Sequence, residues 1–121
     1  MTISILAVDD SQTMRDMISL ALKDEDFDIH LAEDGQQGLE VLDGLSPDVI
    51  LTDINMPRMD GFAFIDAIRV RADSRHTPIL VLTTESSNDL KARARDAGAT
   101  GWIVKPFAQD KLVRALRMVA G

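Results

Sequence analysis

The chain has 121 residues, which suffice for one domain with a hydrophobic core and are too few for two. Its formal net charge of −7 disfavours nucleic acid as a partner, and no apolar run approaches the roughly 18 residues of a membrane span. With no cysteine and no basic leader, the sequence excludes disulfides and a signal peptide, and we assign residues 1–121 to one cytoplasmic domain.

Five short apolar runs predict β-strands. The first, third and fourth runs are almost entirely apolar, as in parallel strands that helices cover on both faces. The second run alternates apolar and polar residues, which predicts an edge strand. The expected strands are residues 3–8, 27–32, 48–52, 78–83 and 101–105.

Segments with helical periodicity separate and follow these strands. Ser11 and Asp60 precede two of them and are candidate N-caps, whereas Gly98 ends another as a candidate C-terminal cap. The alternation of strand and helix, repeated five times, predicts an α/β fold with a doubly wound parallel sheet.

Polar residues follow four of the expected strands, at the edge where ligands bind in such sheets. They are Asp9 and Asp10, Asp53, Thr83, and Lys105. Three neighbouring carboxylates repel one another, and a single lysine cannot neutralise them. Oxygen ligands suit Mg²⁺, which keeps a position open for a phosphate oxygen. Because a carboxylate can attack phosphorus, the set predicts a site that forms an aspartyl phosphate.

Each of these residues also has an ordinary structural explanation. Asp10 could cap the first helix, Thr83 could be a strand-end threonine, and Lys105 could be a solvated lysine. Their coincidence at one edge of the sheet favours the functional hypothesis. We assign no role to His30 or His76.

The motifs "VDDSQTMR", "LTDINMPRMDG", "VLTT" and "GWIVKPF", in this order and spacing, resemble the receiver domain of bacterial two-component response regulators, most closely the single-domain chemotaxis regulators. The resemblance covers the whole chain. It implies a flavodoxin-like fold with five helices and strand order 2-1-3-4-5, and one receiver domain without an output domain. It also implies a phosphorylation switch rather than a multiple-turnover enzyme.

The resemblance implies a role for each motif residue. Asp53 is the expected phosphoacceptor. Asp9 and Asp10, together with Asp53 and the backbone carbonyl of Asn55, are the expected Mg²⁺ ligands. Lys105 is expected to pair with the phosphoryl group and to precede a cis peptide bond to proline.

Five positions concern signalling or the lifetime of the phosphoryl group. Thr83 is expected to turn its hydroxyl toward the phosphoryl group. Trp102 occupies the place of the switch aromatic, where Tyr or Phe is usual. Thr84 stands where receivers often have Ala or Gly. Asn55 and Glu85 stand where the family tunes phosphoryl lifetime.

Charge is unevenly distributed along the chain. Residues 1–85 hold 17 acidic and 6 basic residues, whereas residues 86–121 hold 3 and 7. Most such charges belong to solvated helix faces. The asymmetry nevertheless predicts an acidic partner for the surface of the fourth helix, fifth strand and fifth helix. The expected contact residues are Lys91, Arg95, Trp102, Lys111 and Arg114.

The expected partners are a chemotaxis-type sensor histidine kinase, the flagellar motor switch and a phosphatase, with the chain itself a monomer. A phosphate sink and a phosphorelay intermediate share the same site and remain alternatives. A Mg²⁺-dependent phosphatase is a distant alternative, because "DDSQT" lacks the D-x-D-x-T signature of such enzymes. A flavin carrier would need a phosphate loop in place of Asp9 and Asp10.

Overall fold

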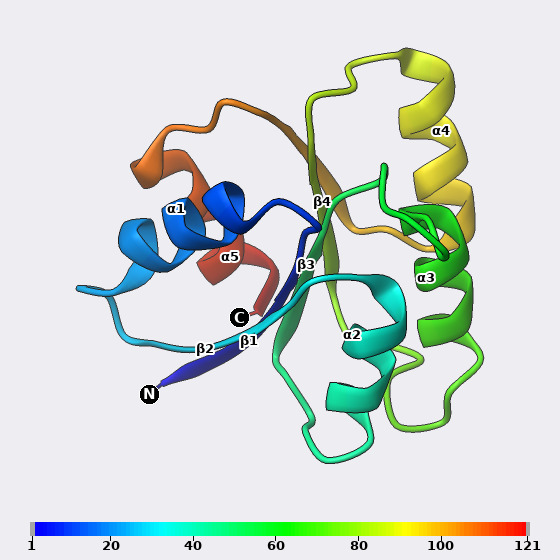
Figure 1. The fold of residues 1–121 in the computed structure, drawn as a ribbon, viewed down its shortest axis with the longest axis horizontal. Coiled ribbons are helices and arrows are strands. Elements are labelled where there is room, and N and C mark those ends of the chain that lie inside the picture. The colour runs from blue at the N-terminus through cyan, green and yellow to red at the C-terminus, as the bar shows by residue number, and fades with distance from the viewer. Residues whose placement is uncertain (1, 121) are drawn as a thin grey trace.

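The computed structural model describes residues 2–120, in which five strands alternate with five helices (Figure 1). Each predicted strand is present, with its boundaries within one residue of those expected. The predicted α/β fold is therefore confirmed. In chain order the elements are β1 (Ile3–Val8), α1 (Gln12–Leu22), β2 (Phe27–Ala32), α2 (Gly35–Leu42), β3 (Val49–Thr52), α3 (Gly61–Arg69), β4 (Ile79–Thr83), α4 (Asn88–Ala97), β5 (Gly101–Val104) and α5 (Gln109–Ala120).

The strands form one parallel sheet in the order β2-β1-β3-β4-β5. This is the order that the resemblance implies, and β2 lies at an edge as its alternating sequence predicts. α1 and α5 cover one face of the sheet, and α2, α3 and α4 cover the other (Figure 1). None of the helices within residues 2–120 has the length and apolar character that a membrane crossing requires.

Two hydrophobic clusters, one on each face, hold the layers together. The cluster under α1 and α5 includes Leu22 and Leu116, and the cluster on the opposite face includes Phe64 and Ile68. Every residue of β3 and β4 is buried, which explains why their sequences are almost entirely apolar. The central strands therefore form a rigid base for whatever follows their carboxyl ends.

The predicted helix caps are confirmed. The Ser11 hydroxyl accepts a hydrogen bond from the Met14 amide at 3.2 Å, and the Asp60 carboxylate accepts one from the Ala63 amide at 2.9 Å. Gly98 ends α4 with φ of 116°, a conformation that favours glycine. Asp60 therefore starts α3, as the sequence indicates.

Gly61 begins α3 at a point where the chain leaves no room for a side chain. A Cβ atom here would stand 2.3 Å from the backbone oxygen of Asp53 and 2.7 Å from the Cα of Ile54. The Gly61 amide donates to the Ile54 carbonyl at 2.7 Å. This close approach fixes the start of α3 against Asp53 and Ile54, the two residues that follow β3.

Replacing Gly61 with alanine should destabilise the fold by about 1–3 kcal/mol, because the clash involves backbone atoms that cannot rotate away. Gly44→Ala is the matched control, since a Cβ there meets nothing within 4 Å. Its effect should stay within about 0.5 kcal/mol. Urea unfolding followed by circular dichroism measures both, and equal stabilities of the two variants would contradict the packing argument.

Candidate functional site

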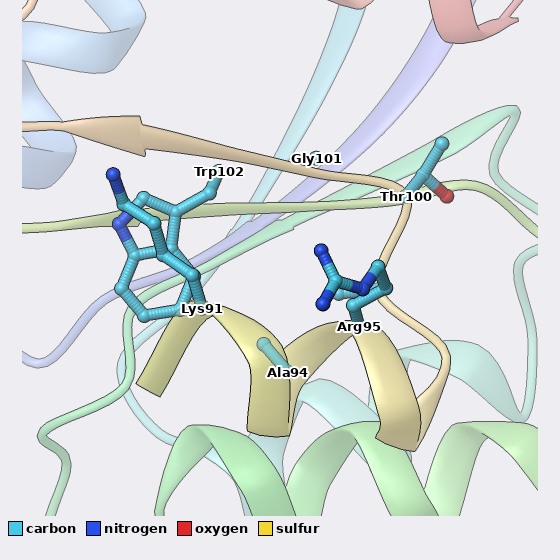
Figure 2. A pocket seen from close by; sticks show the side chains of 7 residues that line it. Lys91, Ala94, Arg95, Thr100, Gly101 and Trp102 are labelled. Atoms are coloured by element: carbon cyan, nitrogen blue, oxygen red, sulfur yellow. The ribbon is translucent and has the colours of Figure 1, made fainter. Parts of the chain in front are cut away.

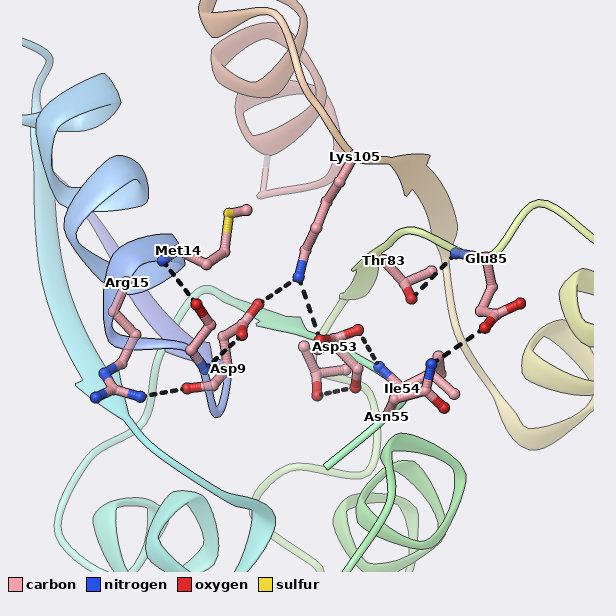
Figure 3. A network of polar contacts seen from close by, with 11 residues as sticks. Asp9, Met14, Arg15, Asp53, Ile54, Asn55, Thr83, Glu85 and Lys105 are labelled. Atoms are coloured by element: carbon pink, nitrogen blue, oxygen red, sulfur yellow. Dashed lines mark hydrogen bonds and ion pairs between the residues drawn. The ribbon is translucent and has the colours of Figure 1, made fainter. Parts of the chain in front are cut away.

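The carboxyl ends of four strands meet at one edge of the sheet. The predicted residues found there are Asp9 after β1, Asp53 after β3, Thr83 at the end of β4 and Lys105 after β5. The Asp53 amide donates to the Val8 carbonyl at 3.0 Å, which sets Asp53 beside the end of β1. Figure 3 shows Asp9, Asp53 and Lys105 pointing toward one another.

Three carboxylates, Asp9, Asp10 and Asp53, form what we call the acidic cluster. One oxygen of each lies within 4.8 Å of the others. Asp9 and Asp53 are 1% and 7% exposed, whereas Asp10 is exposed. The Lys105 ammonium lies 2.7 Å from Asp9 Oδ2 and 3.2 Å from Asp53 Oδ2. One ammonium thus bridges the two buried carboxylates and cannot neutralise all three.

The electrostatics of the cluster favour binding of a further cation. Burial raises the pKa of the Asp9 carboxyl, and the hydrogen bonds from Lys105 and the Ser11 amide offset this only in part. Burial alone would lower the pKa of the Lys105 ammonium, but its hydrogen bond to Asp9 and the charge of Asp53 outweigh burial and raise that pKa. Lys105 therefore stays charged, and the carboxylates remain short of positive charge.

The donor set fits a hard divalent cation such as Mg²⁺. Each member of the cluster offers a carboxylate oxygen, the ligand that Mg²⁺ prefers. Asn55 lies in the loop that follows Asp53, so a backbone carbonyl is available close to the cluster. The residues present are therefore able to hold the ion that the sequence predicts.

Local hydrogen bonds orient the carboxylates. Asp53 Oδ1 accepts the Ile54 amide at 2.7 Å, and Asp9 Oδ1 accepts the Ser11 amide at 3.0 Å. The Arg15 guanidinium donates to the backbone carbonyl of Asp9 at 2.6 Å. The sequence analysis missed this role of Arg15, although its position in the first turn of α1 places it near the end of β1.

Glu85 connects the edge of the site with Trp102. Its amide donates to the hydroxyl of the buried Thr83 at 3.4 Å, and its carbonyl accepts the Trp102 indole N–H at 2.9 Å. Its carboxylate accepts the Asn55 side-chain amide at 3.2 Å (Figure 3). Sequence reasoning placed Glu85 near the site but did not reveal that one residue contacts all three partners.

Trp102 borders two hollows on the surface of α4, β5 and α5. The first has a volume of about 210 Å³ and lies between α4 and β5, with Lys91 and Arg95 at its rim (Figure 2). The second, of about 430 Å³, includes Lys111. Arg114 borders neither of these, because it lines a separate hollow with Glu25. The structure thus brings three of the four predicted basic contact residues around Trp102, while Arg114, also on α5, lines a separate hollow.

Comparison with known proteins decides the family. The model of the response regulator receiver domain matches residues 5–117. This chain belongs to the response regulator receiver domain family. The fold and the strand-end residues of this receiver domain are those that its sequence motifs predict.

Three known proteins show the extent of the likeness. The transcriptional regulatory protein PdtaR of Mycobacterium tuberculosis is 39% identical over 115 residues, covering 94% of this chain and 55% of PdtaR. The chemotaxis protein CheY4 of Vibrio cholerae has a TM-score of 0.94 and 42% identity, over 98% of this receiver domain and 99% of that chain. The chain therefore spans about half the length of the curated relative PdtaR.

The third similar protein is the receiver domain of the sensor histidine kinase PA1611 of Pseudomonas aeruginosa. It has a TM-score of 0.91 and 27% identity, covering 100% of this receiver domain and 99% of its own chain. That structure has a magnesium ion coordinated in its active site cleft.

The structure also shows three further features that the sequence analysis singled out. The Lys105–Pro106 peptide bond is cis, as the resemblance implies. Trp102 is half-buried, and Thr84 is exposed next to the buried Thr83.

Replacing Asp10 with asparagine should stabilise the metal-free receiver domain, because it removes one of three mutually repelling carboxylates. It should also reduce the stabilisation by Mg²⁺, which for one site at 100 times the dissociation constant is about 2.7 kcal/mol. Thermal unfolding with and without MgCl₂ measures both effects. Asp24→Asn changes an exposed carboxylate outside the cluster and should alter neither. Loss of metal-free stability in Asp10→Asn would contradict the repulsion argument.

Proposed function

We propose that this receiver domain is a phosphorylation switch in which Asp53 accepts a phosphoryl group from a sensor histidine kinase. The proposal rests mainly on the position of the Asp53 carboxylate. Asp53 follows a fully buried strand and is 7% exposed, and its carboxylate lies in the acidic cluster, 3.2 Å from the Lys105 ammonium. Membership of the receiver family supports the phosphodonor.

The geometry suggests which oxygen reacts. Asp53 Oδ1 accepts the Ile54 amide, whereas Oδ2 faces Lys105, so Oδ2 is the proposed nucleophile. As it bonds to phosphorus, the bond from phosphorus to the imidazole nitrogen of the donor breaks, and that nitrogen keeps the electron pair. Lys105 then offsets the charge on the phosphoryl oxygens.

Asp9, Asp10, Asp53 and the backbone carbonyl of Asn55 would hold Mg²⁺. When bound, the ion would offset negative charge on the phosphoryl oxygens. The oxygen donors of the acidic cluster support this assignment, as does the magnesium ion in the active site cleft of the PA1611 receiver domain.

Thr83 and Trp102 would carry the signal outward. If the Thr83 side chain turns so that its hydroxyl donates to a phosphoryl oxygen on Asp53, the hydroxyl oxygen moves away from the Glu85 amide and their long hydrogen bond is lost. The Trp102 indole is bonded to the carbonyl of the same Glu85, so displacement of this residue would release the indole. The surface of α4, β5 and α5 would then change between two states.

The proposed output is binding of an acidic segment of the flagellar motor switch to this surface. The basic residues around Trp102 and the 42% identity to the chemotaxis protein CheY4 support it. A phosphate sink or a phosphorelay intermediate would use the same acceptor site without this partner. In each case we propose a monomeric cytoplasmic switch, on which a phosphatase can act, rather than a multiple-turnover enzyme.

Acetyl phosphate with MgCl₂ should add one phosphoryl group to the wild-type chain and none to Asp53→Asn, whose amide is not a nucleophile. Intact-mass spectrometry measures the adduct, which should survive acid, disappear in base and fail to form with EDTA. Asp60→Asn, which keeps a helix cap outside the cluster, is the control and should be phosphorylated normally. A phosphate that still forms on Asp53→Asn would overturn the acceptor assignment.

Changing Lys111 and Arg114 to glutamate should weaken phosphorylation-dependent binding of an acidic motor-switch peptide by about tenfold or more, because like charges would then face each other. Fluorescence anisotropy at low salt measures the affinity. Arg75→Glu reverses an exposed charge in the loop between α3 and β4 and should have no effect. Unchanged binding by the Lys111 and Arg114 variants would rule out this surface as the output.

A further inference from the structure

An ion pair joins the loop after β3 to the start of α2. Asp34 is the N-cap of α2, where its Oδ1 accepts the Gln37 amide at 2.8 Å. Its second oxygen, Oδ2, accepts a hydrogen bond from the Arg58 guanidinium. Asp34 is 5% exposed, whereas the Arg58 side chain that contacts it is 68% exposed. Arg58 therefore connects the segments that follow β2 and β3, the two strands on either side of β1.

The backbone of Arg58 is unusual. Among residues 2–120, Arg58 is the one residue other than glycine with a positive φ, at 66°. A long side chain disfavours this conformation, which persists only where surrounding contacts hold it. The Met59 amide donates to the Pro57 carbonyl at 2.7 Å across Arg58, and the contact with Asp34 restrains the same residue through its side chain.

The loop between β3 and α3, residues 53–60, is anchored at several other points. Ile54 and Met56 are buried, and the Gly61 amide closes the loop onto the Ile54 carbonyl at 2.7 Å. Met59 packs against Gly35, where a Cβ would lie 2.9 Å from the Met59 sulfur. Asn55 lies within this anchored loop and is itself exposed.

We propose that the Arg58–Asp34 ion pair is a positioning device that sets the Asn55 backbone carbonyl for cation binding beside the acidic cluster. This inference rests on the proposed function, since it assumes that the cluster binds Mg²⁺. Mg²⁺ demands near-ideal octahedral geometry, so its affinity is sensitive to small displacements of a ligand. Arg58 acts through the loop and does not touch the ion.

The Asp34 carboxylate accepts hydrogen bonds from two donors, one on each oxygen. The Gln37 amide and then Arg58 lower the pKa of Asp34, so the carboxylate is charged at neutral pH. Because the Arg58 side chain is itself 68% exposed, its removal would let water reach the Asp34 carboxylate directly. What would be lost is the tether between α2 and the loop that carries Asn55, so the loop would gain freedom at Arg58.

Two substitutions separate this role from general stability. Arg58→Gly removes the guanidinium while favouring the positive φ, so the fold should not lose thermal stability through backbone strain. Asp34→Asn removes the charge but keeps a good N-cap for α2. Isothermal titration calorimetry with MgCl₂ measures the affinity of each variant and of the double variant, and thermal unfolding without metal measures stability.

A second ion pair provides the matched control. Arg71, which follows α3, lies 3.0 Å from the carboxylate of Asp43, which caps the other end of α2. This pair also joins α2 to a segment next to α3, but it lies at the opposite end of α2 from Asp34. Arg71→Ala should therefore leave the Mg²⁺ affinity unchanged.

Arg58→Gly and Asp34→Asn should each weaken Mg²⁺ binding by about tenfold, the lower end of what loss of a supporting contact usually costs a metal site. The double variant should bind no more weakly than the single variants, because both remove one interaction. Wild-type affinity in both single variants would overturn this inference alone, as would losses that add in the double variant. A wild-type chain that does not bind Mg²⁺ would overturn the proposed function as well.

Discussion

The rest of this structure depends on one electrostatic constraint: three carboxylates lie close together, and a single ammonium contacts two of them. Asp9 and Asp53 are buried at the ends of β1 and β3, and Lys105 contacts both. Such a group opposes folding, because charge is removed from water without full compensation. The buried central strands and the two helical layers hold it in place. The same lack of positive charge that opposes folding is the basis of the proposed affinity for a cation and for a phosphoryl group.

Much of the fold follows from local patterns in the sequence. β3 and β4 are short, fully buried and apolar, so their positions are evident from composition alone. Ser11, Asp60 and Gly98 mark helix ends by chemistry that acts over a few residues. The strand order could not be predicted from local patterns, because the pairing of strands depends on contacts between distant segments. It was predicted from the resemblance to receiver domains.

The residues that the strand topology brings together were predictable from the sequence. The contacts that depend on side-chain conformation were not. Residues after parallel strands must share an edge, so Asp9 and Asp53 were expected together. The contacts of Glu85 with Thr83 and Trp102 depend on the path of one loop, and no sequence period encodes such a path. The Arg58–Asp34 pair spans 24 positions and rests on an irregular backbone. Arg114 and Lys111 are both on α5 yet line different hollows, which helical spacing alone did not indicate.

The most direct test of the account is a crystal structure of this chain grown with MgCl₂ and beryllofluoride, a stable mimic of a phosphoryl group on a carboxylate. We expect the mimic on Asp53 Oδ2, with Lys105 contacting a fluoride. We also expect the metal on Asp9, Asp10, Asp53 and the Asn55 carbonyl. A mimic bound to another residue, or a metal bound away from the acidic cluster, would contradict the central claim.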